Sequence, residues 1–445
     1  MLSSDFFDGK CMSEKGKFSE TTAMAIVVAN MIGTGIFTSL GFQLADIRSG
    51  FVIMTLWVLG GVMSLCGALC YAELGSKLPR SGGEYNFLTA IYHPGAGFVS
   101  GWISATVGFA APTALAAMTF GTYLSSVFPS LNPLWLATIL IVSMTAVHST
   151  SHKNSGGLQD FFTSGKILLI VGFSVAALIS ADTLQDVSYV PEKSDISLFT
   201  GGAFAVSLIY VGYAYTGWNA ATYLTSELEN PRKSLPRVLL VGTAAVMLCY
   251  LLLNYVFLAT APMDAMAGEL EIGYISATYA FGDVGGTIMG LSLSLLLIST
   301  VSAMLVAAPR VLQMLGEDYS LFKKLAKKNN HGIPATAIWL QSIMALIFLW
   351  SATFESILLF SGATMAINSL AVVIGVFILR KRQPCDDGSF KIPFYPLPPI
   401  IFIAITLVTL VYLTIQSTME IIFSVTLIAL GAIGYWLTKK YSKKA

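Results

Sequence analysis

One stretch of the sequence decides the fold: Asn30-Met31-Ile32-Gly33-Thr34-Gly35-Ile36-Phe37. Two glycines flank a threonine in the middle of an apolar segment that we expect to be a helix over 20–45. Each glycine weakens a helix by ~1 kcal/mol relative to alanine. The pattern therefore predicts a break in this helix near Gly33 and Gly35.

A second apolar segment carries a similar interruption, Tyr213-Ala214-Tyr215-Thr216-Gly217-Trp218-Asn219. Either motif alone fits the packing of small residues between membrane helices equally well. The two motifs fall in corresponding spans, however, and matched interruptions in two halves indicate a binding site near the membrane midplane. We therefore favour two broken helices that face each other.

The composition indicates a membrane protein. Of the 445 residues, 55% are hydrophobic and only 11% are charged, whereas a soluble chain of this length needs more charge to cover its surface. Several apolar blocks approach the ~20 residues that span a bilayer, and the alternating segments of a β-barrel are absent. We expect an all-α integral membrane protein with 12 transmembrane helices. The expected helices cover 20–45, 51–75, 94–128, 133–150, 157–181, 200–228, 235–261, 284–315, 334–352, 354–382, 392–417 and 419–438.

Charge distribution predicts the orientation. The net charge of +1 implies no nucleic-acid partner. Most lysines and arginines fall in loops on one side, so the positive-inside rule places the N- and C-termini in the cytoplasm and the chain in the cytoplasmic membrane. The first residues are polar, which predicts no cleaved signal peptide. The five cysteines and four histidines lack the clustering of a metal site, so we expect free thiols, no metal and no cofactor.

A helix break at membrane depth offers backbone groups that an intact helix does not. N–H groups are free at the N-terminus of a half-helix, and carbonyl groups are free at its C-terminus. A zwitterion needs both. We expect the N–H groups of 33–35 to bind a carboxylate, and the carbonyl groups of Met31, Tyr213, Ala214 and Thr216 to bind an ammonium group.

Further motifs, taken in their order and spacing, resemble the amino acid–polyamine–organocation (APC) superfamily. Within it, the chain is most similar to L-type amino acid transporter-like bacterial permeases. The matching pieces are 33–37, 71–74, 79–85, 159–162 with Lys166, 214–219, 229–232, 332–334 and 390–393. The resemblance implies one transporter domain over 1–445 with a five-plus-five inverted repeat, the leucine-transporter-like fold. Repeat one then covers about 19–181, repeat two about 200–382, and two C-terminal helices about 391–438.

The resemblance also implies the site residues. Those for substrate binding are Met31, Gly33, Thr34, Gly35, Tyr213, Ala214, Thr216 and Asn219. Tyr213 matches the aromatic gate over the substrate, and Asn219 matches a side-chain contact. Many L-type members carry glycine where this chain has Thr216. A threonine there should shrink the pocket, which disfavours the largest aromatic substrates.

Lys166 is the sole charged residue deep in an expected span, and such a residue is a functional hypothesis by default. It could titrate in proton coupling, act as a fixed cation held by carbonyl groups near the first break, or extend towards the cytoplasm. No carboxylate lies within one helical turn of it along its helix, so we favour the fixed cation. The matching lysine of the family links the first break to helix five.

Glu73 and Glu84 flank Lys77 and Arg80 in an expected cytoplasmic loop. Two readings stay open. The four side chains could form solvated ion pairs of little energetic consequence, or they could belong to an inner gate.

The residues together predict a secondary active transporter that carries neutral amino acids by alternating access. No carboxylate lies deep in the expected helices one, three, six, eight or ten to pair with a cationic side chain. We favour amino acid exchange, with proton symport as the alternative and protons then as a further partner. The expected spans show no nucleophile paired with a base, which argues against an intramembrane enzyme. The chain has no P-loop, so ATP is not expected to drive transport. An internal repeat in a single chain argues against a channel. The expected partners are the amino acid and the lipid bilayer.

Overall fold

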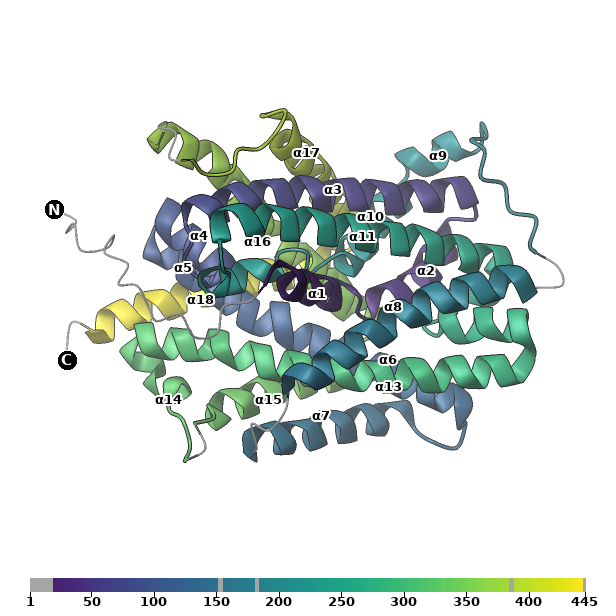
Figure 1. Cartoon of the computed structure of the whole chain (residues 1–445), viewed down its shortest axis with the longest axis horizontal. Coiled ribbons are helices and arrows are strands. Elements are labelled where there is room, and N and C mark those ends of the chain that lie inside the picture. Colours follow the sequence, from purple (N-terminus) through teal and green to yellow (C-terminus); the bar gives the residue numbers. More distant parts are fainter. Residues whose placement is uncertain (1–18, 151–154, 181–183, 331, 384–387, 443–445) are drawn as a thin grey trace.

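Long helices run side by side along the longest axis of the molecule (Figure 1). The computed structural model describes residues 19–150, 155–180, 184–330, 332–383 and 388–442, and for 155–163 and 441–442 it describes the backbone alone. Helices α4, α5 and α14 lie at one end of the bundle, and α9 lies at the other (Figure 1).

Nine helical segments of the described chain are long and apolar enough to cross a membrane. They are Glu20–Asp46 (α1 and α2), Gly50–Lys77 (α3), Pro94–Val127 (α5, η2 and α6), Pro133–Thr150 (α7), Pro231–Thr260 (α11), Ile272–Asp318 (α13), Phe354–Arg382 (α16), Leu397–Gln416 (α17) and Thr418–Lys440 (within α18, Thr418–Ser442). Three shorter apolar helices accompany them: Ser164–Ser180 within α8 (Ser155–Ser180), Gly202–Ala214 (α10) and Ala335–Ser351 (α15). The protein is therefore an all-helical, multi-pass membrane protein, as the composition predicts.

Several boundaries differ from the expected ones. The expected helix over 94–128 consists of α5 (Pro94–Ile103), a π-helical stretch η2 (Ser104–Ala110) and α6 (Ala111–Val127). Helix α13 begins well before the expected residue 284, because two helical stretches join at Gly282, whose φ of 73° few other residues adopt. Helix α17 begins later than expected, because prolines precede it and a proline has no backbone N–H to donate within a helix.

Short helices between the spans were not expected. They are α4 (Gly83–Ile91), α9 (Asp195–Thr200), α12 (Met263–Met266), η4 (Ser320–Phe322) and α14 (Lys323–Ala326). They follow turn or polar residues and lack the length that makes periodicity informative. Of these short helices, α4 contributes residues to the candidate site.

Both predicted breaks are present. Helix α1 (Glu20–Met31) ends near the middle of the expected helix, and α2 (Gly35–Asp46) follows it. Helix α10 ends at Ala214, and after a turn the chain continues as the 3-10 helix η3 (Ala220–Glu227). The helices α1 and α11 pack together, as do α2 and α10, so the two broken helices lie within the bundle.

Glycines allow the two breaks to pack backbone against backbone. A Cβ atom on Gly35 would lie 2.5 Å from Ala214 Cα, and one on Gly217 would lie 2.8 Å from the carbonyl carbon of Asn30. Gly217 also has φ of 99°, the left-handed region that side chains disfavour. Each broken helix thus needs a glycine where it touches the other.

Candidate functional site

The first turn of α2 presents backbone N–H groups without a side-chain cap. Its N-cap is Thr34, which makes no capping hydrogen bond with its side chain, and the first N–H groups of a helix have no partner within it. A Cβ atom on Gly33 would approach no atom beyond Met31 O, at 3.9 Å, so space is open beside Gly33. The break therefore gathers Met31, at the C-terminus of α1, with Gly33, Thr34 and Gly35 at the N-terminus of α2. The N–H group of Gly33 is already bonded, because it donates to Met31 O at 2.8 Å.

The carbonyl ends of the two broken helices converge on one hydroxyl group. Tyr250 of α11 donates from its phenol to Met31 O at 2.5 Å and to Ala214 O at 3.0 Å. A phenol has one proton, so it can fully bond only one of these carbonyl groups at a time. Tyr213 O accepts from the backbone N–H of Thr216 at 2.9 Å and from its hydroxyl at 2.7 Å. The expectation that these carbonyl groups are free is therefore wrong for this structure. Met31 O also accepts from the backbone N–H of Gly33 at 2.8 Å, and Tyr213 O already has two donors, so of these three oxygens Ala214 O alone has a single recorded donor.

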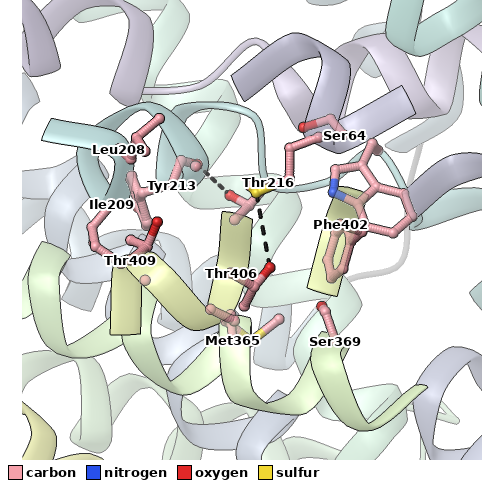
Figure 2. Close-up of a pocket in the computed structure, with 15 residues that line it drawn as sticks. Ser64, Leu208, Ile209, Tyr213, Thr216, Met365, Ser369, Phe402, Thr406 and Thr409 are labelled. Atoms are coloured by element: carbon pink, nitrogen blue, oxygen red, sulfur yellow. Dashed lines mark hydrogen bonds between the residues drawn. The ribbon is translucent and has the colours of Figure 1, made fainter. Parts of the chain in front are cut away.

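Tyr213 and Thr216 line a cavity of about 60 Å³ between α3, α10, α16 and α17, which Figure 2 shows. Most of its lining is apolar, and Met365 and Phe402 face Thr216 across it (Figure 2). A cavity that binds a ligand the size of benzene measures about 150 Å³, so this smaller cavity has room for water but not for an amino acid. None of the first-break residues lines this cavity.

Asn219 is bonded to a buried carboxyl group of α4. Its amide Nδ2 donates to Glu84 Oε1 at 2.5 Å. The same carboxyl group accepts from the hydroxyl groups of Tyr71, at 3.1 Å, and of Tyr223. Glu84 has no exposed surface at all. Asn219 is therefore committed to Glu84 in this conformation.

Glu73 is the second buried carboxylate on this end of the molecule. Arg380 of α16 donates to both of its oxygens, at 2.7 and 2.5 Å, and the backbone N–H of Ile392 donates at 2.9 Å. Lys77 lies 3.9 Å away. The reading of Glu73 and Glu84 as solvated ion pairs is wrong, because both carboxyl groups are buried.

Lys166 lies in α8 and is 4% exposed. Its ammonium group donates to the hydroxyl oxygen of Thr300 in α13 at 3.0 Å. The side chain thus points into the bundle and does not extend towards water. The partner is a hydroxyl group on α13, whereas carbonyl groups near the first break were expected. Helix α8 still packs against α1.

Aromatic side chains cover the opposite end of the breaks from Glu84. Phe42 of α2 stacks on Phe354 of α16 with ring centroids 5.8 Å apart, and Tyr210 of α10 donates to Glu355. Ser39 donates to Tyr210 O at 3.3 Å. The two broken helices are thus bonded to each other and to α16 at this end.

Metal-binding clusters of three or more histidine, cysteine, aspartate or glutamate residues do not occur in the described ranges. Cys66, Cys70 and Cys249 are free thiols, as expected. Cys11 and Cys385 lie outside the described residues, as do the side chains of 159–162 in the resemblance motif.

Sequence reasoning missed Tyr250 and the partners of Glu84. Tyr250 stands in an apolar run of α11, where a tyrosine is unremarkable, and it lies 219 residues from Met31 in the sequence. Glu84 lies 135 residues from Asn219. Only the fold brings these groups together.

Fold and site define a multi-pass helical membrane protein in which two broken helices meet inside the bundle. The sequence pattern of the amino acid permease family matches residues 18–437, and the chain belongs to this family, within the APC superfamily. The serine/threonine exchanger SteT of Bacillus subtilis (strain 168) is 27% identical over 428 residues, which are 94% of this chain and 95% of that protein.

Two further relatives are mammalian. The large neutral amino acids transporter small subunit 2 of Homo sapiens is 28% identical over 410 residues, 88% of this chain and 75% of that protein. The b(0,+)-type amino acid transporter 1 of Mus musculus is 25% identical over 435 residues, 94% of this chain and 87% of that protein. All three are amino acid transport proteins by name, and the family is one of transporters.

Proposed function

We propose that this protein is a secondary active transporter of neutral amino acids that works by alternating access. One observation carries the proposal: the uncapped first turn of α2 begins beside open space at Gly33 and packs against the end of α10. A helix N-terminus favours a carboxylate through its N–H groups and dipole. The substrate carboxylate then binds the N–H groups of 33–35.

The ammonium group binds where carbonyl oxygens already converge. Met31 O and Ala214 O lie within hydrogen-bonding distance of one phenol, that of Tyr250, so they are close to each other. Ala214 O keeps a lone pair for a second donor, whereas Met31 O would exchange its donor from the Gly33 N–H for the ammonium group. Tyr213 and Thr216 continue the site from α10, with Tyr213 as the gate over the substrate. Asn219 acts on the site through Glu84.

Neutral side chains suit this site. The residues that line the cavity beside Tyr213 are apolar or carry hydroxyl or thioether groups, and none is charged. A cationic side chain would be desolvated there without an anionic partner, which is costly. We propose small or medium neutral amino acids, because Thr216 takes up room beside Tyr213.

Exchange is the proposed mode, and SteT is an exchanger by name. The buried ammonium group of Lys166 favours a second candidate, proton symport, because a buried lysine can give up its proton. Its partner, the Thr300 hydroxyl, accepts from the charged form. This supports a fixed cation and hence exchange.

The proposed topology has twelve crossings, made by the nine long segments and the three shorter apolar helices. The first repeat then runs from α1 to α8 and the second from α10 to α16, followed by α17 and α18. Exposed lysines at 323, 324, 327 and 328 lie at the end that carries α4 and α14. The positive-inside rule makes this end cytoplasmic, with both termini on that side.

Counterflow in proteoliposomes tests the function. Vesicles loaded with one neutral amino acid are diluted into the same labelled compound, across a panel of neutral, acidic and basic amino acids. A carrier gives uptake that unlabelled internal substrate accelerates. Gly33→Val, which fills the open space, should abolish this uptake, whereas Gly172→Val should not, because a Cβ atom on Gly172 meets nothing within 4 Å.

Three results would decide against the proposal. Flux that internal substrate does not accelerate would indicate a channel. Uptake that follows a proton gradient without internal substrate would indicate symport. Full activity in Gly33→Val would remove the first break from the site.

A further inference from the structure

Glu84 is the most completely enclosed carboxyl group at the proposed cytoplasmic end. It lies in the first turn of α4, and its side chain has no exposed surface. Tyr71 of α3 and Asn219 donate to one oxygen, at 3.1 and 2.5 Å, and Tyr223 of η3 donates to the other. The structure records no ion pair for Glu84 within the described part of the chain. Three uncharged donors from two other elements therefore satisfy this group.

The same contacts fasten η3 to α4 along its length. A Cβ atom on Gly83 would lie 2.9 Å from the ring of Tyr223, so α4 and η3 are in close contact. Ser81 lies before α4, and its hydroxyl oxygen lies 2.5 Å from that of Ser226 and accepts from the Ser226 backbone N–H at 3.0 Å. The Glu84 carboxyl group stands at the inner end of this seam, next to the break.

Tyr71 supports the seam from α3. Its ring is fully buried and meets Trp218 edge-on, with ring centroids 4.6 Å apart. Trp218 and Asn219 belong to the turn that follows α10, so the break itself rests on α3 and α4. Any movement of η3 away from α4 must separate Glu84 from Asn219 and Tyr223.

We propose that Glu84 is a positioning residue that latches η3, the inner half of the second broken helix, onto α4 and α3 while the pathway is closed to the cytoplasm. The inference rests on the proposed transport function, because alternating access requires half-helices to move. Opening breaks the two hydrogen bonds from Asn219 and Tyr223 and admits water to the carboxyl group. Glu84 touches no substrate in this scheme.

The surroundings of Glu84 also determine its charge. The titratable groups that face Glu84 are Tyr71 from α3 and Tyr223 from η3. Helix α5 carries no titratable residue, and the arginines at the end of α16 bind Glu73 and the carbonyl group of Ile91 instead. Burial raises the pKa of Glu84 above its ordinary value of 4.5, against the opposing effect of its hydrogen bonds. The closed gate therefore holds the proton more tightly than the open gate does.

The sign of the pH effect follows from this difference. A carboxyl group whose pKa is raised in the closed state stabilises that state fully below pH 4.5, and this contribution is lost as the pH rises through the raised pKa. A rise in cytoplasmic pH should thus favour opening. Glutamine cannot ionise, so Glu84→Gln should stay closed at every pH.

Thiol labelling of a reporter behind the latch tests the proposal. Ser104→Cys in a variant with the five native cysteines replaced by serine provides the reporter, because Ser104 is buried and lies 3.5 Å from the Tyr223 hydroxyl. A membrane-impermeant maleimide is added to the cytoplasmic face between pH 5 and 8. Rates are divided by those of the denatured protein at the same pH, which removes the reactivity of the thiol itself.

With Glu84 present we expect slow labelling that accelerates as the pH rises. Glu84→Ala removes the acceptor for three donors and should accelerate labelling about tenfold or more at pH 5, as expected for the loss of more than one buried hydrogen bond. Glu84→Gln should label slowly at all pH values. Glu227→Gln is the matched control, since Glu227 is an exposed carboxylate on η3 itself, and it should behave like the parent.

A parent rate in Glu84→Ala would overturn the latch. Labelling of Glu84→Gln as fast as that of Glu84→Ala would overturn the role of the neutral acid. If Glu84→Ala does not fold, Tyr223→Phe removes one donor and should accelerate labelling less strongly, and an unchanged rate there also overturns the proposal. Substrate binding by Gly33→Val is measured in parallel. If Gly33→Val loses binding but the Glu84 variants label like the parent, the latch is wrong and the proposed substrate site stands. If Gly33→Val binds normally, the proposed substrate site itself is wrong.

Discussion

Gly33 and Gly35 are separated by one residue and have different surroundings. A Cβ atom on Gly35 would overlap the backbone of Ala214, whereas one on Gly33 has no neighbour closer than 3.9 Å. We expect Gly35→Ala to lower the free energy of unfolding by about 1–3 kcal/mol, as overpacking does. Gly33→Ala should melt like the parent but bind amino acid more weakly, because its methyl group enters the space for the carboxylate. Thermal melting in detergent with and without substrate measures both effects.

Gly172→Ala is the control for glycine replacement as such, because it lies in α8 with open space around it. Melting of Gly35→Ala at the parent temperature would mean that the two breaks are not packed together as described. Parent affinity in Gly33→Ala would mean that the carboxylate binds elsewhere.

Tyr250 joins the two breaks through a single hydroxyl group. Tyr250→Phe leaves the ring in its buried position but removes the donor to Met31 O and Ala214 O. We expect a loss of stability of about 1–3 kcal/mol, because two buried carbonyl groups lose the donor that they share. Amino acid binding should weaken in parallel, since the carbonyl groups lose their fixed positions. Equal melting temperatures for Tyr250→Phe and the parent would contradict this.

At the scale of helices, the sequence predicted the long apolar elements and both breaks, because length, composition and glycine placement are local properties. Short α4 was missed, since nine residues between two spans give no clear periodicity. The side-chain partners of Glu84 and Tyr250 were missed for another reason. They depend on which distant elements pack together, and a single sequence does not contain that information.

The ion pair of Glu73 and Arg380 fixes α3 to the end of α16. Arg380→Ala leaves Glu73 buried with Lys77 and the backbone N–H of Ile392 as its remaining partners. Because Lys77 still supplies a positive charge and Arg380 is 25% exposed, the loss should stay below the cost of about 3–5 kcal/mol for a fully buried pair. We expect a marked fall in melting temperature and poor yield in detergent. Arg237→Ala is the matched control, because Arg237 lies 3.8 Å from Glu20 on the surface, where an ion pair contributes at most about 1 kcal/mol. Similar melting of the two variants would refute the structural role of the buried pair.

For the whole molecule, the described contacts close the region of the breaks at both ends. Phe42, Tyr210 and Phe354 cover one end, and the Glu84 cluster covers the other. The cavity beside Tyr213 is smaller than an amino acid. Transport therefore requires one end to open at a time, and residues that connect the two proposed repeats should set the balance between the two openings.

Lys166 is such a residue, because it joins α8 of the first proposed repeat to Thr300 in α13 of the second. A fixed cation keeps its charge through the cycle, so Lys166→Met should shift the balance between the two open states. Apparent affinity would then change more on one membrane face than on the other. A titrating lysine predicts another result, the loss of any dependence of uptake on the proton gradient.

We expect the first result, because Thr300 offers Lys166 a hydroxyl oxygen as acceptor and no carboxylate takes part in this hydrogen bond. Oriented proteoliposomes with substrate added to either face at several pH values measure the effect. Thr300→Val keeps the lysine but removes its partner, so it should shift affinities in the same direction by a smaller factor. Lys193→Met, at an exposed loop lysine, should leave both faces unchanged. Equal affinities on the two faces of Lys166→Met, combined with a lost pH dependence, would establish the titrating role and favour symport over exchange.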